Sequence, residues 1–182
     1  EGDPQNPIVT SWPENFNARH DAGHIKPHYF NPQTYLQKAG HGSYVETPTG
    51  EVWLTHLCSR PFRQALRCPL GRETAIQKMV WSDDGWLRMA DGGNLAQHQV
   101  EESNLPSQPF PAKPDRDDFD GQTLDNAFYA PRIRFQRFTS LERKAGYLAL
   151  RGQESLSSLN KVSLLAKKLT SVYASIVTKM DF

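Results

Sequence analysis

Four prolines lie within nine positions near the middle of the chain, at Pro106, Pro109, Pro111 and Pro114. Proline fixes φ and has no amide hydrogen to donate, so neither a helix interior nor a central strand tolerates this density. The sequence therefore predicts an extended linker over residues 106–115. The linker divides the 182 residues into a first part, 1–105, and a second part, 116–182.

The first part carries two successive hairpin signals. Residues 43–47 and 51–57, rich in β-branched and aromatic side chains, flank a short turn that contains Gly50. Residues 74–81 and 86–89 flank the turn SDDG, where Gly85 can take a positive φ without steric cost. Two antiparallel hairpins give four strands, the number in one propeller blade, although part of a β-sandwich has the same pattern.

The end of the second part gives conflicting signals. Apolar residues recur at helical spacing, at Leu165, Leu169, Val172, Ile176 and Met180. The stretch 170–178 is at the same time rich in the β-branched and aromatic residues that favour strands. On the residues alone, both an amphipathic helix and strands stay open.

Three motifs point to one family. The run CPLGRETAIQK at 68–78 follows LQKAGHGS at 36–43 by about thirty residues, and RGQESLSS stands at 151–158. Together they resemble glycoside hydrolase family 43, in particular its β-xylosidases with a β-sandwich behind a five-bladed β-propeller. The resemblance implies an all-β fold. Residues 1–105 would form the C-terminal part of the catalytic propeller, and residues 116–182 the opening strands of the sandwich, with 170–178 in strands.

The resemblance also implies a reaction and its partners. Such enzymes release terminal β-1,4-linked xylose from xylo-oligosaccharides with inversion, and many also release α-L-arabinofuranose. The family's three catalytic carboxylates lie upstream of these residues, so no catalytic residue is assigned here; Glu1 is excluded because the residues after it match the segment that follows the acid. The implied partners are the xylo-oligosaccharide and the remaining segments of the same enzyme. Localisation stays open.

Arg72 is the first candidate site residue. A guanidinium presents a rigid fork of donors that suits sugar hydroxyls or a carboxylate. From the residues alone, a structural salt bridge, for instance with Glu73, is the favoured explanation of Arg72. The resemblance implies instead that Arg72 lines the pocket for the non-reducing xylose and that Glu73 is structural.

His41 is the second candidate. A single histidine beside glycines is usually a hydrogen-bonded structural group. The resemblance implies that His41 lies near the catalytic carboxylates and binds substrate, and that in some members it helps to hold a divalent cation, often calcium. No cofactor is required by this interpretation, and a metal at His41 is its one open alternative.

Other patterns predict surface or structural roles. His20, His24 and His28 have zinc-like helical spacing, but Gly23 and Pro27 argue against the helix and favour a surface loop. Residues 132–138 alternate basic and apolar side chains, which predicts a strand with one charged face. Two clusters of aspartates are expected to have solvated carboxylates. They are Asp83 with Asp84, and Asp117 and Asp118 with Asp120. Cys58 and Cys68 are either bridged or two free thiols.

Composition excludes two classes of partner and leaves one other function class. A formal net charge of +1 gives no reason to expect nucleic-acid binding, and no apolar run of about 18 residues suggests a membrane span. The alternative to a glycosidase is a non-catalytic carbohydrate-binding or structural module. A carbohydrate-binding module would stack sugars on a platform of four aromatic residues: Tyr44, Trp53, Trp81 and Trp86.

Overall fold

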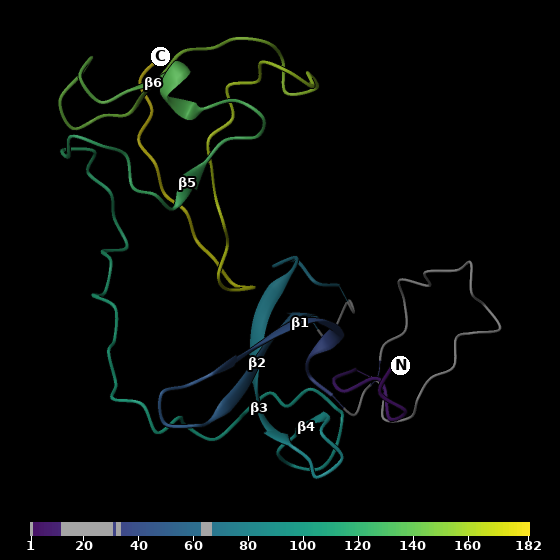
Figure 1. Ribbon diagram of the computed structural model, residues 1–182. Helices are drawn as coiled ribbons and strands as arrows, with labels where there is room; N and C mark the ends of the chain where they lie inside the picture. The colour runs from purple at the N-terminus through teal and green to yellow at the C-terminus, as the bar shows by residue number, and fades with distance from the viewer. Residues whose placement is uncertain (1, 12–30, 32–33, 63–66) are drawn as a thin grey trace. The chain divides into compact units, whose positions relative to one another are not determined.

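The computed structural model describes residues 2–11, 31, 34–62 and 67–182 (Figure 1). Regular structure in these ranges consists of strands and one short 3-10 helix, η2, Phe135–Arg137. The predicted all-β class is therefore confirmed. The chain separates into two units, residues 1–107 with 171–182 and residues 108–170.

A four-stranded antiparallel sheet forms the first unit (Figure 1). Its strands pair in chain order: β1 Gln37–Glu46, β2 Val52–Ser59, β3 Glu73–Trp81 and β4 Leu87–Met89. The two predicted hairpins are both present. Gly50 and Gly85 have φ values of 82° and 81°, so each turn uses a backbone conformation in which glycine has no Cβ to strain.

One face of this sheet carries the core. Alternation along β2 places Val52, Leu54 and Cys58 on that face, and the register brings Met79 of β3 opposite Val52. The side chains that cover them come from outside the sheet: Val9, Leu36 and Ala96. The core therefore joins the sheet to the segments that precede β1 and follow β4.

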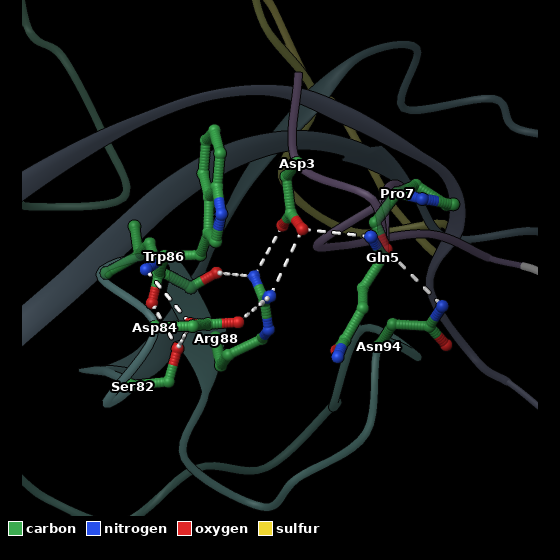
Figure 2. Close-up of polar contacts among 9 residues, drawn as sticks. Asp3, Gln5, Pro7, Ser82, Asp84, Trp86, Arg88 and Asn94 are labelled. Atoms are coloured by element: carbon green, nitrogen blue, oxygen red, sulfur yellow. Dashed lines mark hydrogen bonds and ion pairs between the residues drawn. The ribbon is translucent and has the colours of Figure 1, made fainter. Parts of the chain in front are cut away.

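Polar contacts attach the N-terminal segment to β4 and to the residues that follow it (Figure 2). Thr10 pairs in parallel with Leu95, and its amide donates to the Asn94 carbonyl over 2.7 Å. Nearby, the guanidinium of Arg88 forms a two-nitrogen ion pair with the carboxylate of Asp3, whose side chain is only 4% exposed.

The second unit contains short paired strands. β5, Phe128–Tyr129, pairs with β8, Ala166–Lys167, and β6, Thr139–Ser140, pairs with β7, Ala149–Leu150. The prediction of a strand over 132–138 is wrong. These residues form a bend followed by η2, and Phe138 is buried. Arg132 takes a φ of 66°, which a regular strand does not allow.

The strand predicted over 170–178 is also absent, and so is the alternative helix. In this region the only strand is β8, which ends at Lys167. A β-branched stretch becomes a strand only when it finds a partner strand, and none of the described residues pairs with 170–178.

Candidate functional site

A tight turn delivers Arg72 to the start of β3. Cys68, Pro69, Leu70 and Gly71 form the turn, and the Gly71 amide donates to the Cys68 carbonyl over 3.0 Å. Proline suits the second turn position because its φ is preset, and Gly71 takes a φ of 71°. Arg72 follows directly, is exposed, and precedes the first paired residue of β3.

Two interactions fix the backbone on either side of Arg72. Before it, the Ser59 hydroxyl donates to the Gly71 carbonyl over 3.0 Å. After it, Arg60 donates to the Glu73 carboxylate from Nη2 over 2.7 Å, from Nε over 3.0 Å and from its own amide over 3.2 Å. The hydrogen-bonded Glu73 carboxylate raises the pKa of Arg60. Glu73 thus has the predicted structural role, and its ion-pair partner is Arg60.

His41 lies in a bulge of β1. Gly40 pairs with Leu57 and Ser43 with Thr55, so His41 and Gly42 together oppose the single residue His56. His41 has a φ of 54°, a left-handed conformation that is uncommon outside glycine. The side chain of His41 is exposed, as is that of Arg72.

The register places the two candidates at the same end of the sheet. Arg72 immediately precedes the pair formed by Glu73 and Cys58, and His41 lies two residues further along β2, opposite His56. β2 runs between the strands that carry them. The structure leaves the predicted substrate contacts of both residues untested, and they stay predictions.

The described residues do not fit a metal site at His41. Nowhere in the described ranges do three histidine, cysteine, aspartate or glutamate side chains converge to hold a metal ion. A cation normally needs several such ligands from the protein. A metal ion at His41 would therefore need its other ligands from outside the described residues.

A buried polar network that the sequence analysis missed lies behind the bulge. Gln77, fully buried, donates from Nε2 to His56 Nε2 over 3.1 Å and to the Gln97 carbonyl over 3.1 Å. Its Oε1 accepts from the Gln97 amide over 3.0 Å. Because His56 Nε2 must accept, Nδ1 is the nitrogen that donates to the Leu57 carbonyl, and His56 is neutral. The sequence did contain a hint of this network. His56 alternates with Leu54 and Cys58, so it lies on the apolar face of β2, where a histidine needs a buried hydrogen-bond partner.

The proposed aromatic platform does not exist as a group of four. Trp53 is buried, with the Lys78 ammonium 5.8 Å from its ring centroid. Tyr44 and Trp81 are exposed and lie against each other, with ring centroids 5.5 Å apart. Two of the four residues therefore share a surface, and Trp53 cannot take part.

The remaining residues singled out in the sequence include three histidines, two cysteines and several acidic residues. His20, His24, His28 and Glu1 lie outside the described residues. Cys58 and Cys68 are both free thiols, and Cys58 is buried. The acidic residues expected to be solvated are all exposed: Asp83, Asp84, Asp117, Asp118 and Asp120. Within the described part of the chain, no helix has the length and apolar character to cross a membrane.

Family models match both parts of the chain. Residues 2–87 match the model described as glycosyl hydrolases family 43. Residues 116–182 match the model described as the beta xylosidase C-terminal concanavalin A-like domain.

Curated relatives match along nearly the whole chain. A beta-xylosidase of Bacillus subtilis (strain 168) is 38% identical, with 98% of this chain and 32% of the relative covered. A xylan 1,3-beta-xylosidase of a Vibrio species is 33% identical, with the same two coverages. Xylosidase/arabinosidase 43B of Humicola insolens is 34% identical, over 84% of this chain and 28% of the relative. The chain thus spans about a third of the length of these relatives.

Among solved structures, a xylan beta-1,4-xylosidase from Bacillus halodurans C-125 superposes with a TM-score of 0.79. The two sequences are 44% identical, and the match covers 94% of this chain and 30% of that one.

Proposed function

The chain belongs to glycoside hydrolase family 43, and we propose that it is part of an inverting enzyme that releases terminal β-1,4-linked xylose from xylo-oligosaccharides. The observation that carries this proposal is the 38% identity to a beta-xylosidase over 98% of the chain. A relative named xylosidase/arabinosidase supports α-L-arabinofuranose as a second sugar that the enzyme releases. Members of this family generally need no cofactor.

In this proposal the 182 residues bind and orient the sugar. Arg72 donates to the hydroxyls of the terminal xylose, and its position is supported by the two fixed neighbours Gly71 and Glu73. A rigid fork of charged donors is well suited to neighbouring hydroxyls. His41 contributes from the adjacent bulge.

We assign the catalytic carboxylates to other segments of the parent enzyme. An inverting glycosidase needs an acid and a base about 6.5–9.5 Å apart, so that a water molecule fits between base and sugar. The acid must also keep its proton near neutral pH. Support for further segments comes from the curated relatives, of whose length this chain covers about a third.

Intact mass and hydrolysis test this proposal together. Native and denaturing mass spectrometry of the purified material would be combined with an aryl β-xyloside assay on the same sample. A species larger than 20.6 kDa that hydrolyses the xyloside is expected. A folded species of 20.6 kDa that is inactive would overturn the enzyme proposal for this chain and favour a binding module.

Stereochemistry and substitution then test the assignments. Because the enzyme is proposed to invert, the first product from a β-xyloside should be α-xylose, seen by proton NMR before mutarotation. Arg72→Ala should lower kcat/KM by about 10- to 100-fold, since it leaves sugar hydroxyls unpaired in the site. Arg67→Ala, an exposed arginine in the same approach to β3, is the matched control and should leave kcat/KM unchanged.

A divalent cation at His41 is a separate part of the proposal, and its other ligands would have to come from outside the described residues. Loss of activity on dialysis against EDTA and recovery with calcium would support it. Full activity after dialysis, with calcium absent by elemental analysis, would remove it.

A further inference from the structure

Two exposed aromatic side chains share one end of the core-bearing face of the sheet. Tyr44 pairs with Leu54 and Glu46 with Val52, while Trp81 lies two residues beyond Met79. Alternation therefore directs Tyr44, Glu46 and Trp81 to the same face as the core. Tyr44 is 54% exposed and Trp81 47%, so this end of the face is open whereas its middle is covered.

The two rings are held in a fixed arrangement. Their planes meet at 88° with centroids 5.5 Å apart, the edge-to-face geometry that aromatic pairs prefer. Trp81 Nε1 donates to Glu46 Oε1 over 2.8 Å. Because β2 lies between β1 and β3, the indole must reach across β2 to make both contacts. The bond to Glu46 limits rotation of the indole, so the exposed rings are preorganised.

We propose that Tyr44, Trp81 and Glu46 form a second carbohydrate-binding site, which takes a xylose unit of xylan and lies apart from Arg72. The choice of xylose rests on the proposed function. The site itself rests on the geometry of the three side chains.

The chemistry of the three residues suits a pyranose. In β-xylopyranose every hydroxyl is equatorial, so both ring faces present axial C–H groups that can pack on an aromatic ring. Two rings at a right angle offer a face and an edge to one sugar, and burying apolar area against aromatic side chains is a main source of binding energy in such sites. Glu46 Oε2 has no hydrogen-bond partner among the described residues and can accept from a hydroxyl at the rim of the sugar.

The second site is remote from the first along β3. Arg72 precedes the first residue of β3, and Trp81 is its last residue. Nine steps along a strand span about 30 Å, at about 3.3 Å for each residue. One xylose unit cannot occupy both places. The second site would therefore hold polymeric substrate and leave the hydrolysis of a small xyloside unaffected.

Affinity electrophoresis through gels containing soluble xylan tests the proposal on the purified native protein. Wild type should be retarded. Trp81→Ala and Tyr44→Ala should each weaken the apparent affinity for xylan by about tenfold or more, with aryl β-xyloside hydrolysis unchanged. Val45→Ala is the matched control, because Val45 is equally exposed, adjacent in sequence and directed to the opposite face. It should be retarded like wild type.

Each other outcome has a distinct meaning. Equal retardation of wild type and both alanine variants, or no retardation of wild type, would overturn the second site. Equal retardation of wild type by mannan would overturn the choice of xylose. Absence of xyloside hydrolysis with intact retardation would instead count against the proposed function alone. If Trp81→Ala lowers the melting temperature, Tyr44→Ala and Glu46→Gln carry the test, since both positions lie on the edge strand β1.

Discussion

At the residue scale, neighbouring side chains set the chemistry of individual groups. Cys58 illustrates this, because it lies on the core face of β2 and is only 2% exposed. Burial raises the pKa of its thiol, and the nearby Glu73 carboxylate adds to the rise, while Arg60 opposes it. Cys68 is half-buried in the turn that leads to Arg72.

The two thiols should therefore react with Ellman's reagent at different rates. In the native protein at mildly alkaline pH, we expect one thiol, Cys68, to react at least about tenfold faster than Cys58, because the thiolate is the reacting form and burial disfavours it. The rate at Cys58 should keep rising with pH after that of an ordinary thiol has levelled off. Cys68→Ser should remove the fast phase. A fast phase that survives this substitution would contradict the assignment.

Gly42 is a second case in which one residue is fixed by its neighbour. A Cβ at this position would lie 2.9 Å from Leu54 Cδ1 and 3.2 Å from Leu54 Cγ. Leu54 is buried in the core and has little room to move. We expect Gly42→Ala to lower the free energy of unfolding by about 1–3 kcal/mol through overpacking, as measured by urea denaturation. Gly152→Ala, where a Cβ would meet nothing within 4 Å, should change it little.

At the element scale, local patterns predicted the strands that pair with their neighbours in sequence. β2, β3 and β4 follow from alternation and from turns ending at Gly50 and Gly85. β1 begins at Gln37, earlier than predicted, because two bulges break the alternation before Ser43. A bulge shifts the side chains to the other face, so a period-two pattern cannot be followed through it.

Elements that depend on distant partners were not predictable in the same way. The sequence motif placed Arg72 at the entry to a strand, but it gave no indication of the clamp between Arg60 and Glu73. The network at His56 is also non-local, since Gln77 is 21 residues away and Gln97 a further 20. Residues 132–138 alternate without a partner strand and fold as a bend and η2 instead.

The ion pair between Arg88 and Asp3 should be an important attachment of the N-terminal segment to β4. The Arg88 side chain is 16% exposed and that of Asp3 only 4%. Replacing Arg88 by Met leaves the buried Asp3 charge unpaired, and we expect this to lower the free energy of unfolding by about 3–5 kcal/mol. Asp84→Asn removes only the exposed partner of Arg88 and should cost less than about 1 kcal/mol. Urea unfolding of both variants would check this, and equal effects would contradict it.

At the scale of the whole molecule, the prolines give the clearest boundary. The division between the two units, at residues 107 and 108, falls within the predicted linker 106–115, and the second family model begins at residue 116. Every residue from 104 to 118 is exposed. Residues 1–105 and 116–182 remain the proposed domains, although residues 171–182 group with the first unit.

Limited trypsin digestion checks this boundary. The bond after Lys113 is protected because Pro114 follows, whereas Arg116 is 83% exposed at its side chain. We expect the bond after Arg116 to be cut earlier than those after Lys78 and Arg88, which lie within β3 and β4. Mass spectrometry of early time points would identify the products 1–116 and 117–182. Cleavage inside the strands before Arg116 would argue against an exposed linker.

The left-handed backbone at His41 decides how mutational scanning of that position should be interpreted. A scan that replaces His41 by alanine changes two properties at once, since it removes the imidazole and also places an ordinary Cβ residue at a φ of 54°. Asparagine and glycine adopt this conformation most readily, so His41→Asn and His41→Gly keep the bulge and remove only the ring. If the ring binds the sugar, all three variants should lose activity alike. If the backbone alone is what the position requires, asparagine and glycine will be tolerated and bulky β-branched residues will not.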